Sequence, residues 1–408
     1  MTAWIIEPRD PLIVRDGRPF GPDPGARAMT LSFPFPSTTT GGVRTRAGLN
    51  AQGIFDLSSQ QILSLKQFGV RGPLLVQLMP DGNDIAPDGW LVPAPLDALL
   101  LPAKQATPSG EEVALIQQLV PLQLPEGAQT DFDHAGLKLV GMPRPHLGKP
   151  LEKPLHYWNW QFFQSWLLDP LQYNGKPLSL ATIGQSGPQR ERRIHVSIDS
   201  DKEVAKDGML FETSGLEFTS PGKGEQRLTG ARRLALAIAV DDDNQFARRV
   251  REGLTSFAGE RRIVSWRKSS RELPPCPLEL EQAIVEKQAC RVILLTPACF
   301  DEGYLPNWRR SGQQDVKVKP KLEAVATQRP HVVSGWDLEL RKPKSSRRLA
   351  PAGTVIFLTL EGSEEAISKW VRAMWMQCIS DQPQDRTDGF GLCVLGTWSG
   401  QPEVMQKG

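Results

Sequence analysis

The sequence predicts an α+β protein made of two ferredoxin-like domains, each with the RRM-like β-α-β-β-α-β topology. Two observations predict this fold class. The chain opens with an extended segment, a helix and a strand, and it closes with a strand, a helix and a strand. At 408 residues it also exceeds what a single hydrophobic core usually supports. We therefore expect an N-terminal domain over residues 1–275 and a C-terminal domain over residues 276–408.

The N-terminal domain is expected to begin with two extended pieces broken at Pro8 and Pro11. A loop then delivers Ser37 as the N-cap of a helix of roughly a dozen residues, and a strand follows at residues 73–79. Residues 80–154 are rich in proline and acidic side chains and show little periodicity. Because such a length is uncommon for a structureless loop in a compact domain, we interpret this segment as an insertion.

Three further elements complete the expected N-terminal domain. Residues 155–168 have an amphipathic helical pattern whose aromatic side chains are typical of core packing. Residues 192–218 form two alternating runs joined by a polar connector with Asp207 and Gly208, which predicts a β-hairpin. The apolar run at residues 231–240 predicts another strand, and the later "ELPPCP" is a candidate linker at the domain boundary.

The C-terminal domain has the more regular pattern. Strands are predicted at residues 290–296, 353–360 and 391–398. A helix is expected after Ser363, where two glutamates in the first turn interact favourably with the helix dipole. Its apolar side chains share one helical face: Ile367, Trp370, Val371, Met374 and Cys378.

Charge is distributed unevenly along a nearly neutral chain of 48 Lys and Arg against 46 Asp and Glu. Residues 71–133 hold two basic and nine acidic residues, a net charge of −7, whereas residues 309–348 hold eleven basic and four acidic residues, a net charge of +7. The basic window could attract a phosphate backbone that the acidic window would repel. Its densest part lies between two predicted strands, where a hairpin arm could present the cations: Arg341, Lys342, Lys344, Arg347 and Arg348. A solvated loop without a ligand is the alternative.

Several function classes lack support in the sequence. The five cysteines form no CxxC pair, and the histidines have no metal-binding spacing, so we expect neither a disulfide framework nor a zinc site, and no cofactor. No P-loop and no GxSxG motif is present. The N-terminus lacks the pattern of a signal peptide and no run of about 18 apolar residues occurs, so a cytoplasmic protein is expected.

Four stretches, read together, resemble the RAMP superfamily of CRISPR RNA-binding proteins, and more narrowly the third subunit of the Cmr (type III-B) effector complex. They are "WIIEPRDPLIVRDGRPF", "PSTTTGGVRTRAG", "HVSIDSDKEVAKDGMLFET" and "VVSGWDLELRKPKSSRRLAPAGTVIF". The final "GFGLCVLGTW" is similar to the glycine-rich loop of RAMP proteins. The resemblance extends from residue 4 to residue 398, although Thr39-Thr40-Gly41-Gly42 and the acidic insertion depart from the pattern.

This resemblance implies two ferredoxin-like RAMP domains with insertions and a non-catalytic role in a ribonucleoprotein for antiviral defence. The implied ligand is the 5′ repeat-derived tag of the guide RNA (crRNA). The implied protein partners are the large polymerase-like subunit and the first copy of the backbone RAMP subunit. The corresponding subunit of a type III-A complex is an alternative with different partners.

Besides the basic arm, three sets of residues are candidates for RNA contact. The loop Gly389-Phe390-Gly391 could let backbone N–H groups approach a phosphate, or it could be a turn that needs positive φ. A helix N-terminus with hydroxyls and guanidiniums could bind an anion, or be a capped helix with exposed basic residues: Ser37, Thr38, Arg44 and Arg46.

The third set is Arg192, Arg193 and His195 on the predicted hairpin. Some RAMP proteins are endoribonucleases that use a histidine, so His195 raises a catalytic alternative. Cleavage of RNA needs a base, an acid and a stabiliser of the phosphorane, and one histidine beside two arginines supplies only part of that set. We therefore expect a structural or stacking histidine and no enzymatic activity.

Overall fold

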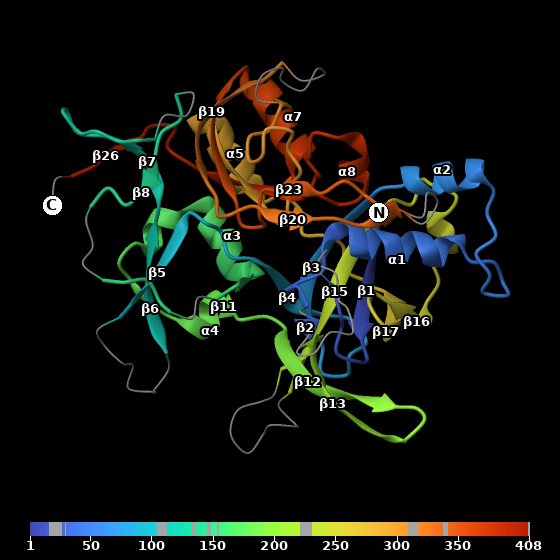
Figure 1. The fold of residues 1–408 in the computed structure, drawn as a ribbon. Helices are drawn as coiled ribbons and strands as arrows, with labels where there is room; N and C mark the ends of the chain where they lie inside the picture. Colours follow the sequence, from blue (N-terminus) through green and yellow to red (C-terminus); the bar gives the residue numbers. More distant parts are fainter. Residues whose placement is uncertain are drawn as a thin grey trace. The chain divides into compact units, whose positions relative to one another are not determined.

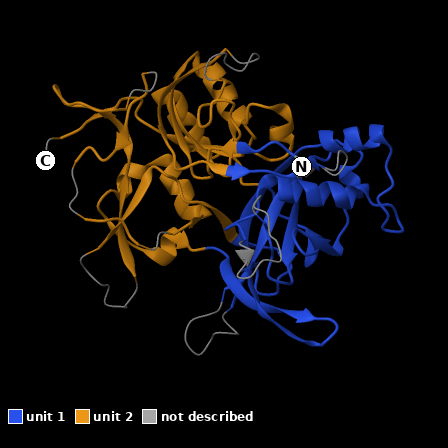
Figure 2. Cartoon of the chain, in the orientation of Figure 1, with its two compact units in different colours: residues 1–87, 187–272, 332–347 blue, residues 88–186, 273–331, 348–408 orange. Residues whose placement is uncertain are grey.

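The computed structural model describes residues 1–15, 27–28, 30–103, 112–132, 136–144, 148–152, 155–220, 231–308, 317–337 and 342–406. The chain divides into two compact units (Figure 2). Unit 1 comprises residues 1–87, 187–272 and 332–347, and unit 2 comprises residues 88–186, 273–331 and 348–408. The chain passes from unit 1 to unit 2 between residues 272 and 273, close to the domain boundary expected near residue 275. Each unit nevertheless consists of three segments, so neither unit is a continuous half of the chain.

Unit 1 is built on an antiparallel sheet (Figure 1). Its strands follow the order β3-β15-β1-β17-β16. Their bounds are β1 Thr2–Pro8, β3 Val70–Leu78, β15 Arg232–Val240, β16 Gly253–Phe257 and β17 Arg262–Lys268, and the short β14 Thr219–Ser220 also pairs with β15. From Leu234 to Val240 every side chain of β15 is buried, as expected for a central strand covered on both faces.

Helix α1, Pro36–Gly48, packs on one face of this sheet, where a Cβ on Gly42 would collide with the ring of Phe257. The helix begins with Pro36, whose fixed φ suits the first helical position, and its N-cap is Phe35. The expectation that Ser37 is the N-cap was therefore wrong. Helix α2, Ser59–Gln67, follows with a capping box between Ser58 and Gln61.

The hairpin predicted at residues 192–218 is confirmed, and it extends beyond the sheet of unit 1 (Figure 1). It consists of β12, Gln189–Asp199, and β13, Val204–Glu217; the short β2, Arg27–Ala28, pairs with β13 in parallel. The turn lies at residues 200–203, and Asp207-Gly208 falls inside β13. The difference arises because a register shift between Val196 and Ile198 lengthens the second strand.

Unit 2 contains a four-stranded antiparallel sheet of order β19-β24-β18-β25. These strands are β18 Ala289–Leu294, β19 Lys319–Ala326, β24 Val355–Glu361 and β25 Cys393–Thr397. The helices are α5 Leu278–Lys287, α7 Glu364–Met374 and α8 Pro383–Thr387. Helix α7 starts after its N-cap Ser363 and buries the predicted apolar face through Ile367, Trp370, Val371 and Met374.

The main sheets of the two units share one strand order. Within each set of four, the second strand in the chain is followed by the third, the first and the fourth: β3-β15-β1-β17 and β19-β24-β18-β25. The mixed α/β class is thus confirmed. One connection differs from a β-α-β-β-α-β unit, because residues 241–261 form the 3-10 turn η3, Ala247–Arg249, and β16 at the place where such a unit has its second helix.

Residues 80–154, interpreted from the sequence as an insertion, contain several strands. These are β4 Ile85–Pro93, β5 Ala98–Pro102, β6 Val113–Gln118, β7 Val120–Gln123 and β8 Val140–Gly141. In unit 2, β5 and β6 form a small sheet with the later strand β10, Pro177–Ser179, in the order β10-β6-β5. Strands β7 and β8 form another with the later strand β26, Glu403–Val404, in the order β26-β7-β8. Two of these strands, β4 and β5, end at prolines, and most of the five are short, so their alternation is hard to recognise in the sequence pattern.

The aromatic segment at residues 155–168 is only partly helical. Helix α3 spans Trp160–Leu168, while β9, Tyr157–Asn159, pairs with β4 and with β11, Gly184–Gln185. The expected core role is confirmed, since Trp158, Phe163 and Trp166 are buried. The 3-10 turn η1, Pro170–Tyr173, and α4, Leu180–Ile183, follow. Within the described residues, no helix is long and apolar enough to span a membrane.

Candidate RNA-binding surface

The described parts of the basic segment, residues 331–337 and 342–349, form the expected hairpin arm, which we call the basic arm. Strand β20, His331–Val333, pairs with β23, Arg347–Leu349, and β21, Trp336–Asp337, pairs with β22, Lys342–Pro343. The N–H of Lys344 also donates to the carbonyl of Gly335 at 2.7 Å. This backbone pairing fixes the positions from which the basic side chains extend.

Three cations of the arm are available to a ligand. Lys342, Lys344 and Arg348 are exposed, and none of them makes an ion pair with a residue in the described part of the chain. Arg347 is half-buried and already has an interaction partner. Arg341 lies outside the described residues. A backbone-paired arm whose exposed cations form no ion pair with a described residue is suited to bind phosphates.

The hairpin β12–β13 carries the second set of predicted residues. The Arg192 guanidinium lies 3.6 Å from Glu212 Oε1, and Arg193 Nε donates to Glu191 at 2.8 Å. His195 Nε2 lies 2.8 Å from Thr213 Oγ1, and its ring stacks on Phe211 with centroids 5.2 Å apart. A hydroxyl and an aromatic ring orient the imidazole, but neither is the second acid or base that RNA cleavage requires.

The two arginines of helix α1 donate hydrogen bonds to backbone carbonyls of unit 1, which corrects the expectation that they are exposed. Arg44 Nη2 donates to the carbonyl of Lys66 at 2.8 Å, at the C-terminal end of α2. Arg46 donates to the carbonyls of Arg251 and Glu252 and lies over the ring of Trp266. Burial, and secondarily the charge of Arg251, lower the pKa of Arg46. Both guanidiniums therefore connect segments of unit 1.

The hydroxyl residues of the same helix give no anion site by themselves. Ser37 and Thr38 are half-buried in the first turn of α1, and no side chain caps this N-terminus. The N–H of Thr38 donates to the carbonyl of Phe35 at 2.9 Å. Compared with this helix N-terminus, the basic arm is thus better supplied with donors that no described residue engages.

Comparison with known proteins shows the family to which this chain belongs. Residues 4–398 match the family model described as CRISPR-associated protein (Cas_Cmr3). The chain belongs to the Cmr3 family. No curated protein matches it. Among solved structures, it is similar to a chain of the Type III-B Cmr-beta bound to cognate target RNA and AMPPnP, with 14% identity, a TM-score of 0.46, and 87% of this chain and 86% of that chain covered. It is also similar to a chain of the Csm3-Csm4 subcomplex of the type III-A interference complex, with 11% identity, a TM-score of 0.34, and coverage of 89% and 94%.

In this Cmr3-family chain the glycine-rich loop is a buried turn. The ring of Phe390 is inaccessible to solvent, and Gly389 and Gly391 have φ values of 94° and 82°. The three N–H groups donate to the carbonyls of Arg386, Asp385 and Pro297, respectively. The expectation that these N–H groups contact a phosphate is therefore corrected, because all three are already used within unit 2.

Substitution of Gly391 by alanine is expected to destabilise the Cmr3-family chain. Its φ is positive, and a Cβ would lie 2.9 Å from the N atom of Ser380, so strain and collision together should cost about 2–4 kcal/mol. Gly303→Ala is the matched control, since its φ is 81° but a Cβ there would meet no atom within 4 Å. We expect chemical denaturation to show a loss of about 1 kcal/mol for the control. Equal losses of stability in the two variants would contradict a collision between the new Cβ at position 391 and Ser380.

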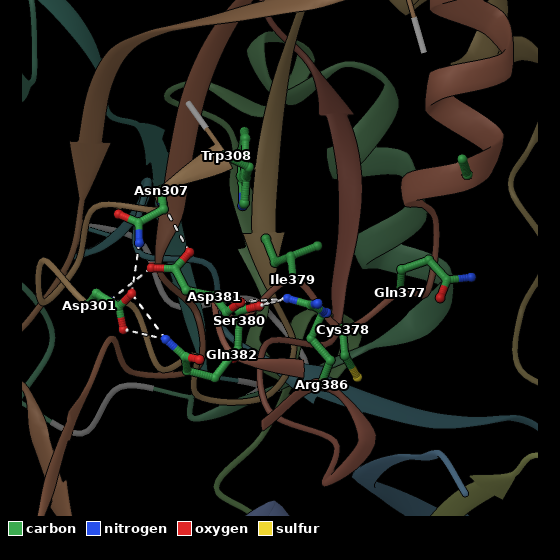
Figure 3. Close-up of a pocket in the computed structure, with 11 residues that line it drawn as sticks. Asp301, Asn307, Trp308, Gln377, Cys378, Ile379, Ser380, Asp381, Gln382 and Arg386 are labelled. Atoms are coloured by element: carbon green, nitrogen blue, oxygen red, sulfur yellow. Dashed lines mark hydrogen bonds between the residues drawn. The ribbon is translucent and has the colours of Figure 1, made fainter. Parts of the chain in front are cut away.

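A cavity of about 590 Å³ is lined in part by Ser380, whose hydroxyl donates to the carbonyl of Phe390 in this loop (Figure 3). Asp381 accepts the N–H groups of Asp301 and Asn307, and Asp301 accepts the side-chain amides of Asn307 and Gln382. Burial raises the pKa of Asp381, and the neighbouring Asp301 adds to this. Two carboxylates in one cavity would repel a phosphate, so this cavity is not part of the candidate RNA-binding surface.

Proposed function

We propose that this chain is a non-catalytic RNA-binding subunit of a type III-B CRISPR effector complex and that it holds the 5′ repeat-derived tag of the crRNA. One observation carries the proposal. Lys342, Lys344 and Arg348 are exposed on an arm held by backbone pairing, and no carboxylate in the described part of the chain pairs with them. Phosphates that replace the counterions of such cations release those ions, which favours binding.

The finer fold and partners belong to the same proposal. The four main strands of each unit, β3-β15-β1-β17 and β19-β24-β18-β25, follow the strand order of ferredoxin-like folds, and we assign them to that topology. The proposed protein partners are the large polymerase-like subunit and the first backbone subunit. Co-purification with neighbouring subunits distinguishes this assignment from the corresponding type III-A subunit, because the two complexes differ in those neighbours.

Salt-dependent binding tests the proposal. The full-length chain is mixed with a fluorescent single-stranded RNA that carries the tag, and anisotropy is followed as the salt concentration rises. The logarithm of the association constant should fall with the logarithm of the salt concentration by about 0.7 per phosphate contact. Binding that does not respond to salt would contradict a phosphate-binding arm.

The catalytic alternative is tested with the same material. Repeat RNA incubated with the chain should stay intact on a denaturing gel. Cleavage at a single site that disappears in His195→Ala would replace the binding role with that of an endoribonuclease. Cleavage that persists in this variant would indicate a contaminating nuclease, which a separate purification removes.

A further inference from the structure

The hairpin β12–β13 carries apolar side chains for which RNA binding gives no role. On β12, Ile194, Val196 and Ile198 are 77%, 39% and 58% exposed. Leu210 of β13, which is paired with Val196, is 57% exposed. Side chains alternate between the two faces of a strand, so the three apolar residues of β12 share one face. The hairpin extends beyond the main sheet of unit 1 (Figure 1), and a contiguous exposed apolar patch is typical of an interaction surface.

Strand β12 is also an open edge of its sheet. It spans 11 residues, Gln189–Asp199, and within the described residues it pairs only with β13, at the end of the order β12-β13-β2. The register shift places its extra residues, 206–209, on β13, so β12 continues without interruption to its last residue. Proline and lysine commonly blunt exposed edges, and β12 contains neither. A long apolar edge favours the addition of another strand.

The charges of β12 are complementary to those of a second, antiparallel β12. Arg193 donates through Nε to Glu191, and its Nη groups engage no described residue. Asp199 Oδ1 accepts the N–H groups of Asp201 and Lys202, whereas Oδ2 engages no residue in the described ranges. Arg193 and Asp199 lie at equal distances in sequence before and after Val196. Two antiparallel strands that meet at Val196 therefore place each guanidinium opposite a carboxylate of the other copy.

We propose that two copies of this chain associate through β12, antiparallel about a twofold axis at Val196. Ile194 of each copy then faces Ile198 of the other, and the two Val196 side chains face each other, so the apolar faces form one continuous row. Such an interface is isologous, because the same surface contributes from both copies. The proposal is independent of RNA binding by the basic arm.

Other registers of the same strands are less complementary. A pair centred on His195 sets Glu191 against Asp199, and like charges directly opposite are destabilising. A pair centred on Ile194 sets the Arg192 guanidinium against Val196. A slip by one residue joins the apolar face of one copy to the polar face of the other.

The hairpin tip favours a second copy over RNA as the occupant. Residues 199–207 hold four acidic residues and two lysines, a net charge of −2, which would repel a phosphate backbone. In the antiparallel arrangement each tip instead approaches two basic residues near the start of the other β12, Arg190 and Arg192. Opposite charges across the pair add to its apolar contacts.

Sedimentation of the purified full-length chain, free of RNA, tests the association. The average mass should rise from 45.2 kDa towards twice that value as the concentration increases through the micromolar range. Val196→Lys should weaken the association at least about tenfold, because it sets two ammonium groups against each other at the axis. Leu254→Lys is the matched control, since Leu254 is an exposed apolar residue, 67% accessible, on another edge strand, β16. Circular dichroism confirms that both variants are folded.

A mixing experiment tests the register. Arg193→Asp and Asp199→Arg each set like charges opposite one another, so each variant alone should be monomeric. Their equimolar mixture restores both opposite-charge pairs and should associate. A wild type that stays monomeric, equal losses in Val196→Lys and Leu254→Lys, or a mixture that does not associate would overturn the proposal. Association that appears only after RNA is added would assign this face to RNA and overturn it as well.

Discussion

Replacement of Arg291 by alanine is expected to lower the free energy of unfolding by about 3–5 kcal/mol, the cost of leaving one partner of a buried ion pair without the other. Arg291 and Asp97 are both inaccessible to solvent and form an ion pair in unit 2. Arg291 also donates to the carbonyl of Thr397 and, at the C-terminal end of α3, to the carbonyl of Trp166, both at 2.8 Å. Its loss would leave two buried carbonyls and one buried carboxylate without this donor.

Thermal unfolding followed by circular dichroism measures this effect. A change of this size should lower the melting temperature by about 10 °C in a unit of roughly 200 residues. Arg291→Lys should also destabilise, because an ammonium cannot reproduce the planar fork that reaches both carbonyls. Arg372→Ala removes a guanidinium that is mostly exposed and serves as the control, with a much smaller shift. A shift for Arg291→Ala no larger than that of the control would contradict the structural role of the buried pair.

Combined alanine substitution of Lys342, Lys344 and Arg348 is expected to weaken RNA binding about a hundredfold at 0.1 M salt. Each cation that neutralises one phosphate contributes about 0.7 to the salt slope on a single strand, so three contacts contribute about 2. At 0.1 M salt the loss of that slope corresponds to about two orders of magnitude in affinity. The folded state should change little, because these side chains are exposed and form no ion pair with a described residue.

A second triple variant provides the matched control. Lys321, Lys369 and Arg372 are also exposed, but each is paired with a glutamate: Glu323, Glu365 and Glu281, respectively. Their replacement by alanine changes the net charge by the same amount, so it reports any effect of overall charge on RNA binding. Equal losses in both triple variants would show that the arm has no special role, and retained affinity in the arm variant would refute it as an RNA contact.

Sequence patterns were sufficient for the elements whose signals are local. The apolar run of β15, three of the four strands of the C-terminal sheet (β18, β24 and β25) and the apolar face of α7 after Ser363 were predicted close to their observed positions, whereas β19 was not predicted. The two hairpins, β12–β13 and the basic arm, were also predicted, because alternation and turn residues report on neighbours in the chain. Ordered motifs over residues 4–398 indicated the family that the comparison then established.

Only the tertiary structure decided which of the predicted site residues have free donors. Arg46 and the glycine-rich loop looked as available as Lys342 and Lys344, yet the guanidinium is bound to carbonyls more than 200 residues away and the loop N–H groups are already used. Likewise, the residues next to Glu7 in the sequence do not indicate that Arg233 and Arg267 bind its carboxylate. The physical reason is that a donor is free or satisfied according to the acceptors within a few ångströms, and these come from strands and loops distant in the chain, which local periodicity does not record.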